Sequence, residues 1–110
     1  MKSLEDFINE ALKNVDELFP WDLEEEINSK ADLLLLDIRE PYEFDAMHIE
    51  GAISVPRGIL ETACDYDYEE TVPELVEARD REIVVICRSG KRSVLAADVM
   101  QQMGTGGSGR

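Results

Sequence analysis

The sequence is poor in the residues from which metal sites and disulfide scaffolds are built. Its 110 residues include 2 cysteines, 1 histidine and 1 tryptophan. A single pair of cysteines, Cys64 and Cys87, makes neither a disulfide framework nor a four-ligand zinc site. We therefore expect no bound metal and no cofactor.

Basic side chains and long apolar runs are also scarce. The chain has 11 Lys and Arg against 25 Asp and Glu, which gives a formal net charge of -14 at pH 7. Such an acidic surface repels phosphate backbones and anionic lipid, so neither nucleic acid nor a membrane is an expected partner. No apolar run approaches the length of about 18 residues that a membrane-spanning helix needs. Residues 1–6 are too acidic for a secretory or transit signal, and a reducing cytoplasm is the expected compartment.

The chain does have enough apolar sequence for one core. Hydrophobic residues make up 44% of a length that is typical of a single domain. Segments with helical periodicity alternate with short apolar runs, a pattern typical of an α/β fold with a parallel sheet. We expect helices or helical turns over 4–19, from 22, after 40, over 57–64, over 72–79 and over 93–103, and strands over 33–38, 52–55 and 83–86.

Both ends of the chain are predicted to differ from the domain between them. The domain is expected to cover residues 1–104, with residues 1–20 as an additional N-terminal helix that Ser3 caps and Pro20 ends. Residues 105–110 contain no apolar side chain and are half glycine. We interpret them as a flexible linker or as residues foreign to the domain.

The most informative segment follows strand 83–86 and reads Cys87-Arg88-Ser89-Gly90-Lys91-Arg92-Ser93. Ligands of open α/β sheets bind beyond the carboxyl ends of the strands, which is where Cys87 falls. If the loop curls around the thiol, its backbone amides and the start of the next helix form an anion-binding nest, and Gly90 supplies the necessary backbone freedom. This nest and the three nearby cations favour a nucleophilic thiolate that needs no adjacent base. A buried thiol at the end of a strand is the alternative interpretation.

Two stretches resemble the rhodanese-like sulfurtransferases. The stretch Asp37-Ile38-Arg39-Glu40-Pro41-Tyr42-Glu43-Phe44, continued by His48-Ile49-Glu50-Gly51-Ala52 and Pro56, is similar to the family's upstream signature, and residues 87–93 are similar to its catalytic loop. The resemblance covers residues 22–104, with Met47 in place of a usual glycine. It implies a rhodanese-like open parallel sheet with helices on both faces. The family's last strand and closing helix have no counterpart in this sequence.

The resemblance also implies an activity, that of a thiosulfate:cyanide sulfurtransferase. Cys87 would take a sulfane sulfur from thiosulfate or a persulfide donor and pass it to cyanide or a protein thiol. The transferred sulfur and the small anionic donor would be bound by the consecutive loop residues Arg88, Ser89, Gly90, Lys91 and Arg92. Asp37 and Arg39 would support this loop from the neighbouring strand, or would form a purely structural ion pair.

Two other functions remain open. Cysteine phosphatases and arsenate reductases also place a cysteine in an amide-lined loop that ends in arginine, but the similar phosphatases use C-x5-R, whereas Cys87 to Arg92 is C-x4-R. The second is a non-catalytic rhodanese-type interaction module, a class that generally lacks the cysteine. We interpret His48 as a structural residue rather than a proton shuttle, and Cys64 as core rather than a resolving thiol.

Strand 83–86 is expected to be a central strand, because it is wholly β-branched and apolar on both faces. Without the family's last strand, one row of its backbone groups would lack partners. We therefore expect that the 110 residues either derive from a longer parent or associate through a dimer or another edge-capping partner.

Overall fold

The computed structural model describes residues 1–17, 19–29, 33–65, 67–77, 81–88 and 90–104. Its strands are β1 (Leu34–Asp37), β2 (Ile53–Ser54) and β3 (Ile83–Ile86). Its helices are α1 (Leu4–Ala11), α2 (Pro20–Ser29), α3 (Pro41–Ala46), the short 3-10 helix η1 (Arg57–Ile59), α4 (Leu60–Ala63), α5 (Pro73–Val76) and α6 (Lys91–Gln102). None of the helices within these ranges is long and apolar enough to cross a membrane.

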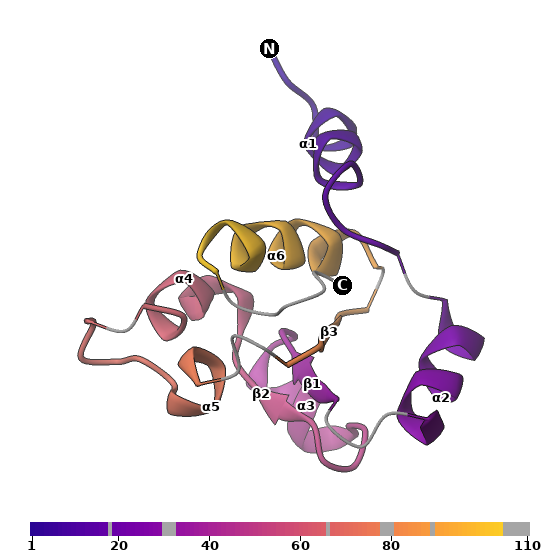
Figure 1. The fold of residues 1–110 in the computed structure, drawn as a ribbon, viewed down its shortest axis with the longest axis vertical. Helices are drawn as coiled ribbons and strands as arrows, with labels where there is room; N and C mark the ends of the chain where they lie inside the picture. Colours follow the sequence, from indigo (N-terminus) through magenta and orange to yellow (C-terminus); the bar gives the residue numbers. More distant parts are fainter. Residues whose placement is uncertain (18, 30–32, 66, 78–80, 89, 105–110) are drawn as a thin grey trace.

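The strands form a parallel sheet in the order β2-β1-β3, which confirms the predicted α/β class. Leu36 of β1 lies opposite Ile53 of β2 and Val85 of β3. Because all three strands are parallel, their carboxyl ends lie at one edge of the sheet. Figure 1 shows α6 along one side of this sheet and α3 beside the strands, with α2 on the far side of β3. The segments that follow β1 and β3 therefore lie next to each other at this edge of the sheet.

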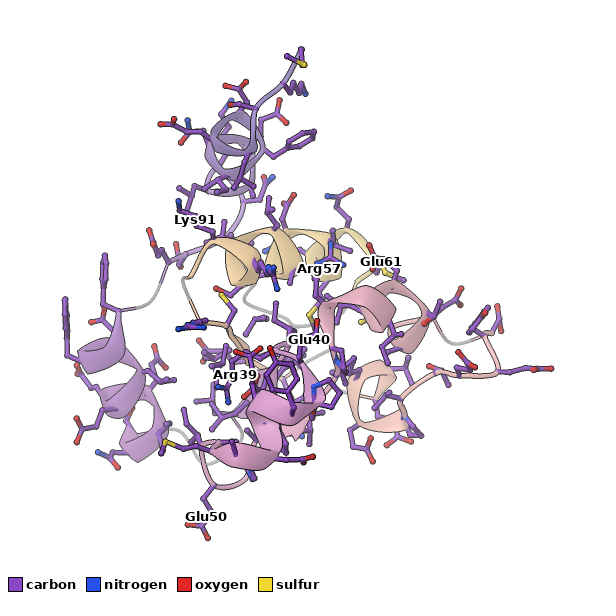
Figure 2. All side chains as sticks on the ribbon, turned by 180° about the vertical axis from the view of Figure 1, so that it is seen from behind. Arg39, Glu40, Glu50, Arg57, Glu61 and Lys91 are labelled. Atoms are coloured by element: carbon purple, nitrogen blue, oxygen red, sulfur yellow. The ribbon has the colours of Figure 1, made fainter. Side chains whose placement is uncertain are left out.

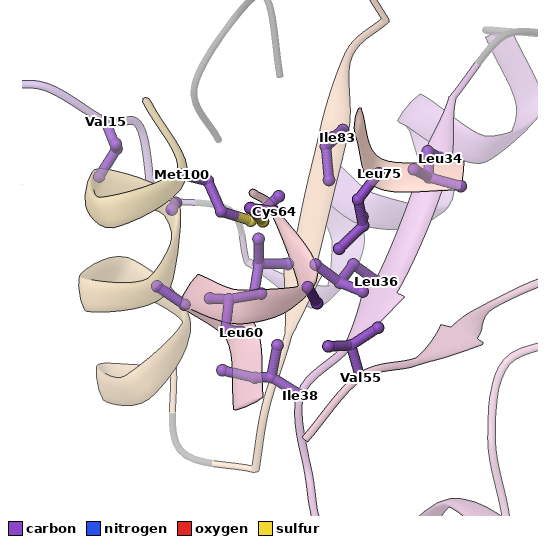
Figure 3. Packing of buried hydrophobic residues seen from close by; sticks show 14 of the residues in the cluster. Val15, Leu34, Leu36, Ile38, Val55, Leu60, Cys64, Leu75, Ile83 and Met100 are labelled. Carbon is purple, nitrogen blue, oxygen red and sulfur yellow. The ribbon is translucent and has the colours of Figure 1, made fainter. Parts of the chain in front are cut away.

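The core lies on the sheet face that α4 and α6 cover. Alternate strand residues contribute to it, as the period of two in a β-strand requires: Leu34, Leu36 and Ile38 from β1 and its end, with Ile83 and Val85 from β3. Figure 3 shows Leu34, Leu36, Ile38 and Ile83 together with other buried side chains, among them Leu60 of α4, Cys64 directly after it and Met100 of α6. This packing holds the sheet and α6 in a fixed relation, and Cys87 lies between the two.

The first helix is shorter than the sequence predicts. Apolar spacing predicts a helix that Pro20 ends, but α1 ends at Ala11 and the chain continues in turns. In these turns the Asn14 side chain donates a hydrogen bond from Nδ2 to Oδ1 of Asp98 on α6 at 3.1 Å. The next residue, Val15, is buried in the core. This tertiary packing outweighs the helical periodicity. Pro20 begins α2, since a proline lacks the N–H that a first helical residue leaves unpaired.

Strand β3 lies at an edge of the described sheet and β1 is central, which agrees with the expectation that strand 83–86 has no partner strand on one side. Leu34 and Ile38 donate backbone hydrogen bonds to the carbonyls of Glu82 and Ile86, so the alternate residues Ile83 and Val85 direct their N–H and C=O groups to the other edge. No described residue extends the sheet there. The strand is nevertheless buried, with Ile83 only 2% exposed.

Within the described ranges no strand pairs with the outer edge of β3, and this edge is where we expect the chain to associate with a partner. We expect the melting temperature to rise by about 2–4 °C for each tenfold increase in protein concentration, because a partner strand binds the folded state alone. Scanning calorimetry over a hundredfold concentration range, with sedimentation velocity on the same samples, measures this. A monomer with a concentration-independent melt would contradict the prediction.

Candidate active site at the end of strand β3

Cys87 follows β3 directly and lies in a turn that leads into α6. Its Sγ accepts hydrogen bonds from the backbone N–H of Gly90 at 3.0 Å and of Ser93 at 3.3 Å. The hydroxyl of Ser93 donates to the carbonyl of Gly90 at 2.8 Å, which closes the turn. The chain therefore curls around the sulfur, as the sequence predicts.

Gly90 makes this turn possible. It is the N-cap of α6 and has φ 82° and ψ -18°, in the left-handed region that L side chains rarely adopt. This conformation directs the amide of Gly90 back to the sulfur while α6 begins at the next residue. The amides and the start of a helix of 12 residues stabilise negative charge on Sγ, and on any sulfur atom bonded to it.

A pocket of about 600 Å³ opens over the sulfur. Its lining residues come from the segments that follow β1 and β3: Ile38, Arg39, Glu40, Tyr42, Glu43, Cys87, Arg88 and Arg92. Figure 2 shows Arg39 and Glu40 at the start of α3, whereas Glu50 points away from the molecule at a distant end. Cys87 is half-buried and lines this pocket, so its sulfur is accessible to a small ligand.

Asp37 and Arg39 form an ion pair at the edge of the pocket. The Asp37 carboxylate is buried, and it accepts hydrogen bonds from the Arg39 backbone N–H at 3.0 Å and from the guanidinium Nη2 at 2.9 Å. The same Nη2 donates to the carbonyl of Met47 at 2.7 Å, which ties the end of α3 to the end of β1. The hydrogen bond to Asp37 raises the pKa of Arg39, and the nearby negative charges of Asp37 and Glu43 add to this effect.

The structure brings together most of the residues that the sequence selects. Arg88 and Arg92 line the pocket with Cys87, and Arg39, two residues after the end of β1, lines it as well. Lys91, predicted to hold a donor at the pocket mouth, is exposed at the first position of α6 and is not a lining residue. Ser89 lies outside the described residues. Asp37 binds Arg39, and the Arg39 guanidinium in turn donates a hydrogen bond to the carbonyl of Met47 at the end of α3.

His48 and Cys64 contact residues that build the fold and lie outside the pocket over Cys87. The His48 ring stacks on Phe44 at 3.8 Å between ring centroids, and its Nδ1 lies 2.7 Å from the Phe44 carbonyl. Cys64 is 2% exposed and belongs to the core cluster. Neither residue lines the pocket over Cys87. Within the described ranges, no group of three or more His, Cys, Asp or Glu side chains could hold a metal ion.

Four lining residues were not selected from the sequence: Ile38, Glu40, Tyr42 and Glu43. Glu43 accepts a hydrogen bond from the backbone N–H of Glu40 at 3.1 Å, as part of a capping box at the start of α3. That box follows β1 at its carboxyl end, the same sheet edge as Cys87. A helix start at this edge is the sequence signal that could have identified the second wall of the pocket.

Replacement of Gly90 by alanine tests the geometry around the sulfur. A Cβ at this position meets no heavy atom within 4 Å, so the cost of Gly90→Ala is the left-handed backbone, about 1–2 kcal/mol. We expect alkylation of Cys87 by iodoacetamide at neutral pH to slow about tenfold, because the amide that stabilises the thiolate turns away.

Gly58→Ala is the matched control, since Gly58 is equally open and has no positive φ. Its alkylation rate should equal that of the unmodified chain. Equal rates for Gly90→Ala and Gly58→Ala would show that the Gly90 amide does not support the sulfur.

Comparison with known proteins places this arrangement in a family. The model of the rhodanese-like domain matches residues 20–107. The chain therefore belongs to the rhodanese-like family.

Individual relatives agree with this assignment. The chain is 31% identical over 96 residues to YrkF of Bacillus subtilis, described as a candidate sulfur carrier protein, with 87% of this chain and 46% of YrkF covered. It is 35% identical over 74 residues to a mitochondrial protein of Schizosaccharomyces pombe described as a candidate thiosulfate sulfurtransferase, with 64% and 52% covered. It is 30% identical over 92 residues to a sulfurtransferase of Allochromatium vinosum, with 84% and 77% covered. The chain thus spans about half the length of the first two.

A solved structure has a similar fold. The protein RPA3614 of Rhodopseudomonas palustris superposes with a TM-score of 0.84 at 30% identity, and the match covers 94% of this chain and 79% of that one. RPA3614 is described as a protein of unknown function and a possible tyrosine phosphatase. The likeness supports the rhodanese-like sheet with its flanking helices.

Proposed function

We propose that the protein is a sulfurtransferase that carries a sulfane sulfur as a persulfide on Cys87. The single observation that carries this proposal is that Cys87 Sγ accepts hydrogen bonds from the amides of Gly90 and Ser93 in the lining of an open pocket. Names of three relatives, as a sulfur carrier or sulfurtransferases, support the same class of reaction. A reducing compartment such as the cytoplasm would keep the sulfur acceptor thiols available.

The reaction consists of two nucleophilic displacements. The Cys87 thiolate attacks the outer sulfur of thiosulfate, the S–S bond breaks, and sulfite leaves with its electron pair. In the second step cyanide attacks the outer sulfur of the persulfide, which forms thiocyanate and returns the Cys87 thiolate. A protein thiolate acts in the same way and receives the sulfur as its own persulfide. No external oxidant or reductant is needed, because each step moves one sulfur atom between nucleophiles.

The residues around Cys87 act mainly through charge. The amides of Gly90 and Ser93 stabilise the thiolate and then the persulfide anion, whose outer sulfur lies farther into the pocket. Arg88 and Arg92 attract an anionic donor or a leaving sulfite. Arg39, fixed by Asp37, holds the α3 wall in place through Met47.

A phosphatase activity is the second candidate, favoured only by the description of RPA3614 as a possible tyrosine phosphatase. Cys87 and Arg92 are separated by one residue fewer than in the phosphatase pattern C-x5-R, and the turn is closed by a hydrogen bond from Ser93 to Gly90. A shorter loop offers fewer amides to the three equatorial oxygens of a phosphoryl group. This supports a turn whose amides are suited to a single transferred sulfur atom.

Intact mass spectrometry tests the proposal. After treatment with thiosulfate, the chain should gain the mass of one sulfur atom, and cyanide should remove it with release of thiocyanate. In parallel, p-nitrophenyl phosphate should give no phosphatase turnover above the rate without protein. A chain that gains no sulfur from thiosulfate or from a persulfide, or that hydrolyses the phosphate ester, would overturn the assignment.

A further inference from the structure

The pocket over Cys87 has two walls of opposite charge. The wall on the loop side carries Arg88 and Arg92, and the wall on the α3 side carries Glu40 and Glu43. The third arginine of the lining, Arg39, is paired with the buried Asp37 at 2.9 Å and contributes little net charge. The cationic nest that the loop sequence predicts is therefore only half of the site.

Opposite walls discriminate between classes of ligand. A small inorganic dianion such as thiosulfate is attracted by the arginines and repelled by Glu40 and Glu43, so these carboxylates oppose its binding. A ligand that carries one negative and one positive group meets an opposite charge on each wall. The arrangement therefore favours a zwitterion over a dianion.

The size of the pocket also favours an organic ligand over a small inorganic ion. Its volume of about 600 Å³ lies within the range of about 300–1,000 Å³ typical of sites for organic ligands. A small inorganic ion would leave most of this space to water and would not reach both walls. Tyr42, largely exposed on α3, adds an aromatic surface to the lining, which can contact the apolar part of an organic ligand.

We propose that the preferred sulfur donor is an amino-acid persulfide with a free ammonium group and a carboxylate, of which cysteine persulfide is the simplest. This inference rests on the proposed function, because it concerns the donor for the same cysteine. The ammonium binds between Glu40 and Glu43, the carboxylate faces Arg88 and Arg92, and the sulfane sulfur lies against Cys87 Sγ. The carboxylates of Glu40 and Glu43 are specificity-determining groups and take no part in bond making.

The transfer step is balanced without a further reactant. The Cys87 thiolate forms a bond to the outer sulfur of the donor R–S–SH, and the S–S bond of the donor breaks. The inner sulfur leaves with the electron pair as R–S⁻, and the proton of the donor's sulfane sulfur passes to it as R–SH. Cys87 is left as the persulfide anion, which the Gly90 and Ser93 amides stabilise.

Two donors that differ only in the ammonium group test the inference. Cysteine persulfide and N-acetylcysteine persulfide, both freshly prepared, are mixed with the full chain, and the rate of sulfur gain on Cys87 is followed by quenched intact mass. The measured quantity is the ratio of the two rates. The same ratio is then measured for the double variant Glu40→Gln/Glu43→Gln, so that any intrinsic difference between the donors cancels. The glutamine at position 43 keeps an oxygen that can accept the Glu40 amide hydrogen bond.

We expect the double variant to lower the ratio by about three- to tenfold, the size that two partly exposed charge pairs provide. Its rate with thiosulfate should rise, because the repulsion is gone. Glu50→Gln is the matched control, since it removes one negative charge from an exposed residue outside the pocket lining and should leave the ratio unchanged.

The outcomes separate the inference from the function on which it rests. Sulfur gain on Cys87 with a ratio that the double variant does not change would overturn the donor class and leave the sulfurtransferase intact. A ratio that falls equally in Glu50→Gln would also overturn it, since the effect would be one of overall charge. Absence of sulfur gain from thiosulfate and from both persulfides would overturn the proposed function itself. Damage to the fold would lower both rates together and would not move the ratio.

Discussion

Replacement of Cys87 by serine should reduce sulfur transfer from thiosulfate to cyanide by at least about a thousandfold, the scale of loss when a catalytic nucleophile is removed. A serine hydroxyl stays protonated near neutral pH and cannot hold a sulfane sulfur as a persulfide. The side chain is half-buried and of similar size, so the free energy of unfolding should change by less than about 1 kcal/mol. Thiocyanate formation and intact mass measure the loss, and a urea melt measures the stability.

Cys64→Ala provides the matched control for this experiment. It removes the other cysteine, which lies in the core at 2% exposure, and should leave the mass gain from thiosulfate in place. If Cys87→Ser still gained sulfur while Cys64→Ala did not, the nucleophile would be the wrong cysteine and the site would have to be placed elsewhere.

Replacement of Asp37 by alanine should lower the free energy of unfolding by about 1–3 kcal/mol, the cost of leaving buried hydrogen-bond partners unsatisfied. The change removes the buried carboxylate that accepts from the Arg39 backbone N–H and from its guanidinium. The Arg39 side chain is 22% exposed and can reach water, so its charge adds little to this cost. A net stability of about 5–15 kcal/mol makes such a loss readily visible in a urea melt.

Glu61→Ala separates this effect from the loss of any ion pair. Glu61 pairs with Arg57 at 2.8 Å on the surface, where its side chain is 53% exposed, so its removal should cost less than about 1 kcal/mol. Equal losses for the two variants would mean that the Asp37–Arg39 pair acts as an ordinary surface pair. The position of the α3 wall would then need another explanation.

Local sequence patterns predicted the elements of the fold better than their boundaries and neighbours. Strand β3 was predicted at its observed residues, because Ile83–Ile86 is a continuous β-branched run bounded by polar residues. The end of α1 at Ala11 was missed, since the apolar spacing continues beyond it and only packing against α6 shows that Val15 is buried from a turn. The open edge of β3 was expected only because the family's last strand has no counterpart in this sequence, since burial on both faces does not report which backbone edge is paired.

In the candidate site, too, the features set by neighbouring residues could be predicted, whereas those set by the tertiary fold could not. The turn around Cys87 could be predicted because Gly90 and the start of α6 lie within a few residues of it. The acidic wall could not, because Glu40 and Glu43 are far from Cys87 in sequence and meet it only through the parallel pairing of β1 with β3. Lys91 was selected for its charge, whereas its position on α6 directs it out of the lining.

Because the two cysteines differ in burial, their reactivity with a thiol reagent reports whether the chain is folded. Cys87 is half-buried and lines a pocket, whereas Cys64 is enclosed in the core. A chromogenic thiol reagent should therefore count one sulfhydryl per native chain and two once the chain is unfolded. Access to the site and loss of the native packing would then appear as separate steps of the same colour reaction. One small sample could thus assay both the accessible cysteine and the integrity of the fold.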